Sequence, residues 1–253
     1  MRNDATIMKS IVAFVIVTFL ASCQTSGDYV PSTGAKRTAL PAQQEARASE
    51  PERDAKNWNL SVLDTARGVN YLTTEEKNVI LELNKVRTNP KEYANLYLVP
   101  SLKYYQGREL TYPGKTTIVT QEGRTAVEEC IRALSSTRPV KPLSPSKALS
   151  SAAKAHVLDT GPKGIVGHTG SDGSSALVRI QRRDKTLRAI AETISYGKGE
   201  ARGIIESLVV DDGVSSRGHR NIILTPEYDS VGPSIGSHTR YGSVCVIDYA
   251  NAP

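Results

Sequence analysis

The alternation of hydrophobic and polar residues predicts an amphipathic helix soon after residue 70. The stretch TTEEKNVILELNKVRTNP carries four apolar residues at helical spacing, namely Val79, Ile80, Leu83 and Val86. Thr73 precedes Glu76 by three residues, which is the capping-box pattern of a helix start. Pro90 ends this helix and suits the first turn of a second one. The pattern therefore predicts two consecutive helices from about residue 73.

Further apolar stripes predict helices over residues 125–136, 144–161 and 199–213. The stretch 229–250 instead carries two runs of small and β-branched residues on either side of SHTRYG, which is typical of a β-hairpin. Helices therefore precede and interleave with a mainly antiparallel sheet. The pattern indicates an α+β fold.

The N-terminal residues 1–22 have the order of a secretory signal. Arg2 and Lys9 precede an apolar run, and small residues follow it. This run is too short for a membrane-spanning helix, which needs roughly 20 residues. The tetrapeptide LASC, which ends at Cys23, resembles the lipobox of bacterial lipoproteins, in which the cysteine is lipidated and becomes the mature N-terminus. The alternative is an ordinary cleaved signal followed by an incidental cysteine.

Residues 23–69 are rich in Ser, Thr, Pro, Ala, Gln and Glu and contain few large apolar side chains, which predicts a flexible tether. The remaining residues, 70–253, have the length of one domain. This organisation predicts a protein of the bacterial cell envelope that is anchored to a membrane through Cys23, outside the cytoplasm. Gln24 rather than Asp follows this cysteine, which favours the outer membrane in a Gram-negative cell.

The formal net charge is +6, and the excess lies mostly in the domain because the basic and acidic residues of the tether balance. A basic domain outside the cytoplasm suits anionic cell-surface polymers or lipid headgroups. No nucleic-acid recognition motif is present, so no nucleic-acid partner is expected.

Two cysteines remain in the domain, Cys130 and Cys245. In an oxidising compartment they form a candidate disulfide, and its closure of a long loop would stabilise the fold by roughly 4 to 5 kcal/mol. The alternative is a pair of buried, unbonded thiols, since each cysteine lies among apolar neighbours.

The chain has four histidines, which differ in context. His156 falls on the apolar face of a predicted helix, where we expect a hydrogen-bonded core residue. His238 lies at the predicted hairpin tip, where we expect it to be solvated. His168 in GHTGSDGSS and His219 in SSRGHRNIIL lie in loops that could present both imidazoles to one cleft, although either could be an ordinary surface residue.

Three acids stand in places that call for a partner. Asp211 and Asp212 end a predicted helix near the negative end of its dipole, where each is unfavourable by roughly 0.3 to 1 kcal/mol. A cation, a metal or a protonated histidine would compensate them, whereas the alternative is a solvated turn. Glu192 lies in the otherwise apolar stretch AETISYG, and nothing nearby in the sequence explains a carboxylate there.

Five segments in a fixed order resemble bacterial members of the CAP superfamily, or SCP domain, which includes cysteine-rich secretory proteins, antigen 5 and pathogenesis-related proteins. These segments are LELNKVRTNPKEYA, LSPSKALSSAAKAHVLD, GHTGSDGSS, AETI and SSRGHRNIIL. The resemblance covers about residues 73–250. It implies a three-layer α-β-α sandwich with a mainly antiparallel central sheet and a cleft lined by two histidines and two acids.

The resemblance also implies roles for four residues. His168 and His219 match the two histidines of the family, Glu192 matches its glutamate, and Asp211 falls at the position of its second acid. These four residues are the predicted cleft. His168 and His219 would be the ligands if the cleft binds Zn²⁺ or another divalent cation.

The sequence departs from the family pattern in three ways. Thr193 replaces the usual Asn, Leu208 and Val209 replace an aromatic pair, and an aspartate stands in place of a glutamate. Because aspartate is one methylene shorter, convergence of all four groups is the feature that these departures put in question.

Three functions are compatible with these observations. The favoured one is a lipid-anchored, ligand-binding module whose partner is a cell-wall polymer, a lipid or a peptide. The second is a hydrolase, either a peptidase or a cell-wall enzyme, with Glu192 as general base. The third is a structural or adhesive surface lipoprotein. The sequence does not decide whether the protein is an enzyme, but it contains no nucleophile elbow, HExxH or catalytic Cys-His motif, which favours binding over catalysis.

Overall fold

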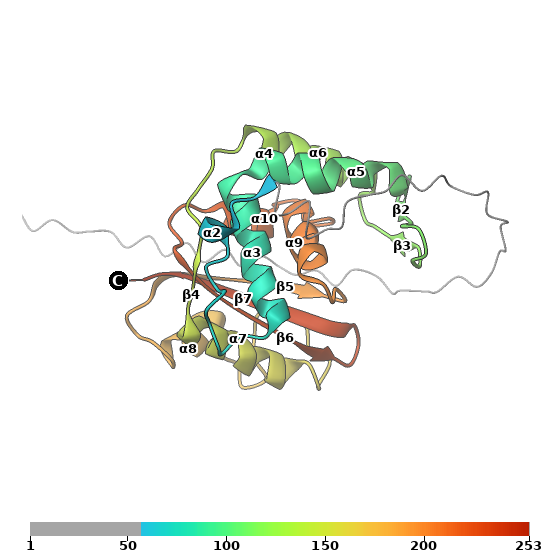
Figure 1. Cartoon of the computed structure of the whole chain (residues 1–253). Helices are drawn as coiled ribbons and strands as arrows, with labels where there is room; N and C mark the ends of the chain where they lie inside the picture. The colour runs from blue at the N-terminus through green and yellow to red at the C-terminus, as the bar shows by residue number, and fades with distance from the viewer. Residues whose placement is uncertain (1–56, 253) are drawn as a thin grey trace, which may run out of the picture.

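The computed structural model of the protein describes residues 57–252 (Figure 1). The predicted signal, the predicted lipidation site at Cys23 and most of the predicted tether lie outside these residues. Within residues 57–252, no helix combines the length and the hydrophobicity needed to cross a membrane.

A four-stranded sheet with the strand order β4-β6-β7-β5 lies at the centre of the fold. Its strands are β4 (Ser144–Pro145), β5 (Arg188–Tyr196), β6 (Ser230–His238) and β7 (Gly242–Asn251). The short β4 pairs with β6 in parallel, and the other pairs are antiparallel. Strands β6 and β7 form the predicted hairpin, which confirms the expectation of a mainly antiparallel sheet.

Helices cover both faces of this sheet (Figure 1). One layer consists of α7 (Lys147–Thr160) and α8 (Ala176–Gln181), and the other of α3 (Thr74–Thr88), α9 (Ala201–Val210) and α10 (Gly218–Leu224). Helix α7 packs on β6 and β7, whereas α9 and α10 both contact β5. The predicted three-layer α-β-α sandwich is confirmed.

The remaining elements extend the second layer. They are α2 (Leu60–Leu63), α4 (Pro90–Tyr93), the π-helix η1 (Ala94–Leu98), α5 (Val99–Ser101), the 3-10 helix η2 (Leu102–Tyr104) and α6 (Arg124–Ser136). A small antiparallel sheet of β1 (Tyr105–Gln106), β2 (Glu109–Leu110) and β3 (Ile118–Val119) follows η2. Figure 1 shows β2 and β3 projecting beside the end of α5.

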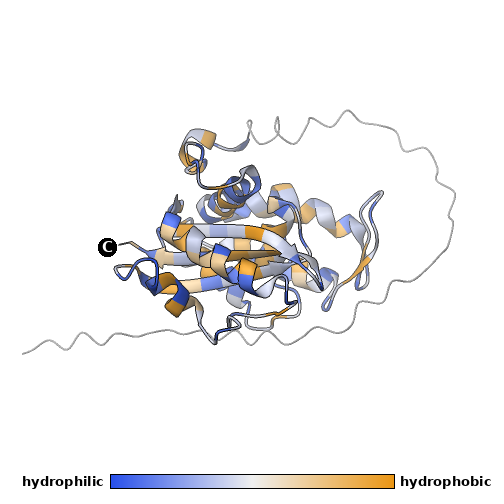
Figure 2. Ribbon diagram, turned by 90° about the horizontal axis from the view of Figure 1, so that it is seen from below, coloured by the Kyte–Doolittle hydropathy of each residue, from blue (hydrophilic) through white to orange (hydrophobic). Residues whose placement is uncertain are grey.

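The largest hydrophobic core lies between the sheet and α3, α6 and α9. Four apolar residues of α3 are fully buried in it: Val79, Ile80, Leu83 and Val86. The predicted capping box is present, because Thr73 and Glu76 bond to each other's backbone N–H and the helix begins at Thr74. Figure 2 shows hydrophobic residues along the strands and a mixture of hydrophobic and hydrophilic residues along the helices.

The predicted boundary between tether and domain at residue 70 is too late. The segment from residue 57 packs on the domain, and three of its side chains are buried in the main core: Trp58, Leu63 and Ala66. The indole Nε1 of Trp58 donates a hydrogen bond to the hydroxyl of Tyr97 at 2.8 Å. A segment with few apolar residues still packs here because one of them is a large aromatic side chain.

The predicted disulfide between Cys130 and Cys245 is wrong, since both are free and buried. Cys130 lies on α6, where its Sγ donates a hydrogen bond to the carbonyl of Val209 in α9 at 3.2 Å. Cys245 lies in the central strand β7. Burial raises the pKa of Cys130 to about 12, so the thiol stays neutral. The two cysteines are therefore buried, unbonded thiols, which was the alternative that the sequence left open.

Candidate functional site

His168 and Glu192 form the first pair of the predicted site. His168 lies in the loop between α7 and α8, and its Nδ1 is 2.8 Å from Oε1 of Glu192 in β5. The Glu192 side chain is only 2% exposed, whereas that of His168 is 30% exposed. The carboxylate is therefore buried, while the imidazole reaches the surface.

Arg179 in α8 is the partner of Glu192 that the sequence analysis missed. Its Nη2 donates to Oε2 of Glu192 at 2.6 Å, and its Nη1 donates to the backbone carbonyls of His168 and Ser174 at 3.0 and 2.8 Å. Burial alone would raise the pKa of Glu192, but the hydrogen bond from His168 and the charge of Arg179 bring it below its ordinary value. Arg179 thus keeps a buried carboxylate ionised. A buried arginine in the apolar stretch ALVRIQ is a weak sequence signal of this role.

Asp248 is a second missed residue of the same cluster. It stands directly opposite Glu192 on the neighbouring strand β7 and is fully buried. No donor among the described residues bonds to either of its oxygens. Burial and the charge of Glu192 hold the pKa of Asp248 well above its ordinary value. The side chain is therefore a neutral carboxyl, because two ionised carboxylates would repel each other in this position.

The loop that carries His168 is held at the preceding residue, Gly167. The Gly167 N–H donates to the hydroxyl of Tyr196 at 2.8 Å, and its carbonyl accepts a hydrogen bond from Nε2 of His156 at 2.9 Å. Gly167 has a φ of 96°, which side-chain-bearing residues rarely adopt. Burial lowers the pKa of His156, so this imidazole is neutral. The predicted core role of His156 is confirmed.

The expectation that His238 is solvated is wrong, since the residue is buried. Its Nε2 donates to the carbonyl of Ile165 at 3.1 Å, and its Nδ1 accepts hydrogen bonds from the backbone N–H groups of Arg240 and Tyr241. The hairpin tip folds against the loop after α7, a long-range contact that the local sequence does not reveal.

Asp211 and His219 form the second pair. Oδ1 of Asp211 is 2.6 Å from Nδ1 of His219, and Oδ2 accepts the backbone N–H of the same histidine at 2.9 Å. Asp211 is the C-cap of α9 in the left-handed conformation, with a φ of 56°, which aspartate tolerates better than most residues. His219 is thus the partner that the helix-end position called for. Asp212 instead accepts the backbone N–H groups of Gln121 and Glu122.

Two arginines outside the predicted set hold the turn between α9 and α10. Arg220 bonds to both oxygens of Glu129 at 2.8 and 2.7 Å, and its Nε donates to the carbonyl of Val209. Arg217 donates to Glu122 and to the carbonyl of Asp211. These bonds tie the turn that presents His219 to the residues in and just before α6.

The four predicted residues form two pairs and not one metal-binding cluster. Among residues 57–252, no group of three or more His, Cys, Asp or Glu side chains is placed to hold a metal. In each pair the carboxylate is hydrogen-bonded to Nδ1 of the imidazole. The Nε2 atom of the same ring has no hydrogen-bond partner in the described part of the chain. Metal-binding histidines commonly have such a carboxylate behind them. The arrangement nevertheless supplies at most two imidazoles, fewer than the three or four protein ligands of typical zinc sites.

One family model and two solved structures show similarity to this chain. The sequence model of the cysteine-rich secretory protein (CAP) family matches residues 82–249, well over half of the chain. An outer surface protein from Borrelia burgdorferi is similar at 18% identity and a TM-score of 0.39, over 45% of this chain and 80% of that one. An extracellular protein containing a SCP domain from Bacillus anthracis is similar at 16% identity and a TM-score of 0.37, over 51% of this chain and 38% of that one. No curated protein matches the sequence.

Proposed function

Because this chain belongs to the CAP family, we propose that it is a ligand-binding module of the bacterial cell envelope, anchored outside the cytoplasm through a lipid on Cys23. The proposed ligand site consists of His168 and His219, with Glu192 and Asp211 behind them. One observation carries this proposal. Each imidazole is fixed through Nδ1 by a buried carboxylate, and its Nε2 has no hydrogen-bond partner among residues 57–252.

A divalent cation such as Zn²⁺ is the small ligand whose chemistry suits these donors. A carboxylate behind Nδ1 orients the ring and makes Nε2 a better ligand. Since the protein supplies at most two imidazoles, water would complete the coordination and the ion would exchange readily. The formal charge of +6 additionally supports an anionic cell-wall polymer or lipid as the larger partner, and a peptide is the remaining candidate.

A hydrolase that uses Glu192 as general base is less well supported. One oxygen of Glu192 is bonded to His168, the other to Arg179, and the side chain is almost inaccessible to water. A general base must reach the proton that it removes. Glu192 is placed to orient His168, so in a hydrolase the proton would move at Nε2 of that histidine.

Zinc titration of the full chain by isothermal calorimetry tests the proposal. Wild type should bind, and His168→Ala and His219→Ala should each weaken binding. Asp211→Asn should weaken it by about 10- to 100-fold through loss of the carboxylate behind the ring. Glu227→Gln, which changes an exposed carboxylate, is the matched control and should bind as wild type does.

The outcomes separate the three functions. No zinc binding by wild type, or binding by both histidine variants as tight as that of wild type, would refute a metal site and favour a structural role. Turnover of peptide or peptidoglycan that disappears in folded His168→Ala would establish the hydrolase instead.

A further inference from the structure

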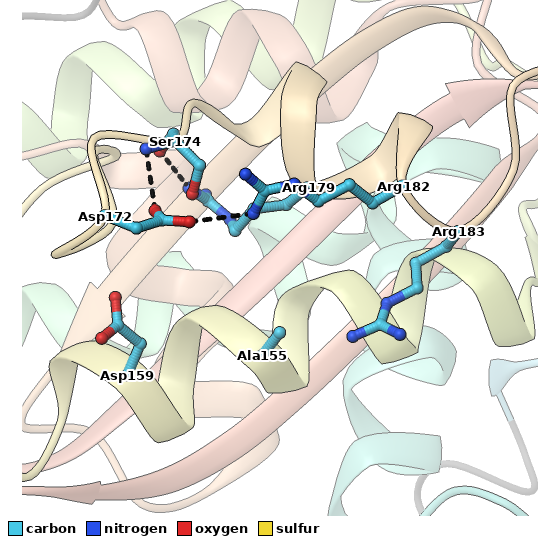
Figure 3. Close-up of a pocket in the computed structure, with 7 residues that line it drawn as sticks. All are labelled: Ala155, Asp159, Asp172, Ser174, Arg179, Arg182 and Arg183. Carbon is cyan, nitrogen blue, oxygen red and sulfur yellow. Dashed lines mark hydrogen bonds and ion pairs between the residues drawn. The ribbon is translucent and has the colours of Figure 1, made fainter.

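A cavity of about 300 Å³ lies between α7 and α8, apart from both histidine pairs. Figure 3 shows the residues that line it. They are Ala155 and Asp159 of α7, Asp172 and Ser174 of the loop between α7 and α8, and Arg179, Arg182 and Arg183. Neither His168 nor Glu192 lines it.

Three arginines follow one face of α8 and the turn after it. Positions 179, 182 and 183 are spaced so that their side chains share a side of a helix. This side faces α7 at Ala155, whose methyl group leaves space that a larger side chain would fill. Packed helices normally fill such a contact with interdigitating side chains. Here guanidinium groups line an open space instead.

The charges around the cavity leave one cation uncompensated. Arg182 pairs with Asp172, Lys163 pairs with Asp159, and Arg179 pairs with Glu192. The guanidinium of Arg183 is exposed and makes no hydrogen bond or ion pair with any residue in the described part of the chain. The cavity therefore has an excess of positive charge at Arg183.

Arg179 provides a second, independent indication of a ligand. Its side chain is only 5% exposed, and its Nε–H is buried without a hydrogen-bond partner among the described residues. A buried donor without an acceptor is costly, so such groups are rarely left unpaired. Because Arg179 lines the cavity, a small movement of this buried side chain would let an anion in the cavity supply the missing acceptor.

We propose that this cavity binds a small oxyanion group, a carboxylate or a phosphate, between Arg183 and Arg179. The planar guanidinium suits such groups because its fixed donors match two oxygens at once. Arg179 also bonds to Glu192 and to the carbonyl of His168. A bound anion would therefore contact an arginine that holds both members of the first histidine pair. The proposal goes beyond the metal site and does not depend on it.

Titrations of the full chain with inorganic phosphate and, separately, with acetate test this site at low ionic strength. Wild type should bind at least one probe saturably by calorimetry. Arg183→Gln should weaken binding by about tenfold or more, as expected for loss of a charged hydrogen bond. Ala155→Leu fills the cavity without a change of charge and should weaken binding similarly, provided that circular dichroism shows an intact fold.

Arg132→Gln is the matched control, because it removes an exposed arginine of α6. It should bind as wild type does. A preference for phosphate or for acetate would identify the ligand group. Absence of saturable binding of both probes, or an equal loss in Arg132→Gln, would overturn the proposal. Zinc affinity should be unchanged in Arg183→Gln, so the cavity and the histidine site can fail separately.

Discussion

The proton on Asp248 should be visible in the stability of the whole domain. The substitution Asp248→Asn replaces a neutral carboxyl by a neutral amide of nearly the same shape. The amide is uncharged beside Glu192 on the facing strand, as the neutral carboxyl is, so the buried cluster should remain intact. What changes is that the amide cannot ionise when the chain unfolds.

The sign follows from the two states of the wild type. Burial and the neighbouring Glu192 raise the pKa of Asp248 far above its ordinary value in the folded protein, whereas in the unfolded chain it should be about 3.9. Above that pH the unfolded chain has released a proton that the folded protein retains, so stability falls as pH rises. The slope is about 1.4 kcal/mol per pH unit while the folded carboxyl keeps its proton, or about 3 kcal/mol over two units.

Urea denaturation of the full chain at pH 5, 6 and 7 measures this slope. The free energy of unfolding of Asp248→Asn relative to wild type should increase with pH by about 1.4 kcal/mol per unit. The control Glu227→Gln alters an exposed carboxylate and should differ from wild type by a constant amount. A constant difference for Asp248→Asn as well would mean that Asp248 is ionised in the folded protein, which would refute the reasoning.

Two further predictions concern the ion pair and the thiols. Glu192→Gln leaves the buried guanidinium of Arg179 without its anion and should lower the free energy of unfolding by about 3 to 5 kcal/mol in urea; a loss below about 1 kcal/mol would contradict a buried pair. Cys130 and Cys245 should resist iodoacetamide in the folded protein at pH 8 and react after unfolding, because burial raises the pKa of both thiols. Mass spectrometry of the labelled peptides gives the result, and labelling of either cysteine in the folded chain would contradict its burial.

Local sequence signals predicted the regular elements well. The capping box at Thr73 and Glu76 and the buried stripe of α3 act between residues no more than four positions apart, so they are legible before the fold is known. The hairpin of β6 and β7 is likewise a pairing of adjacent segments. The start of the domain was placed too late because the burial of Trp58 depends on Tyr97 and the main core, which lie far along the chain.

Part of the site could also be predicted from the sequence. The order of the family segments identified His168, Glu192, Asp211 and His219, and the structure joins them as two pairs. The sequence could not reveal the role of Arg179, because an arginine in an apolar stretch does not show which buried acid it will pair with. The disulfide expectation had the same weakness, since it used the number of cysteines without knowing which elements they face.

The sequence by itself thus determined the long helices α3, α6, α7 and α9, the hairpin, the CAP-type order of segments and the residue types of the site. The tertiary structure alone decided which carboxylate holds which imidazole, that Asp248 is neutral beside an ionised Glu192, and that no three metal-binding side chains converge within residues 57–252. The physical reason is the range of the forces involved. Helical periodicity and capping are local, whereas burial, charge pairing and the protonation of a buried carboxyl depend on contacts between distant segments.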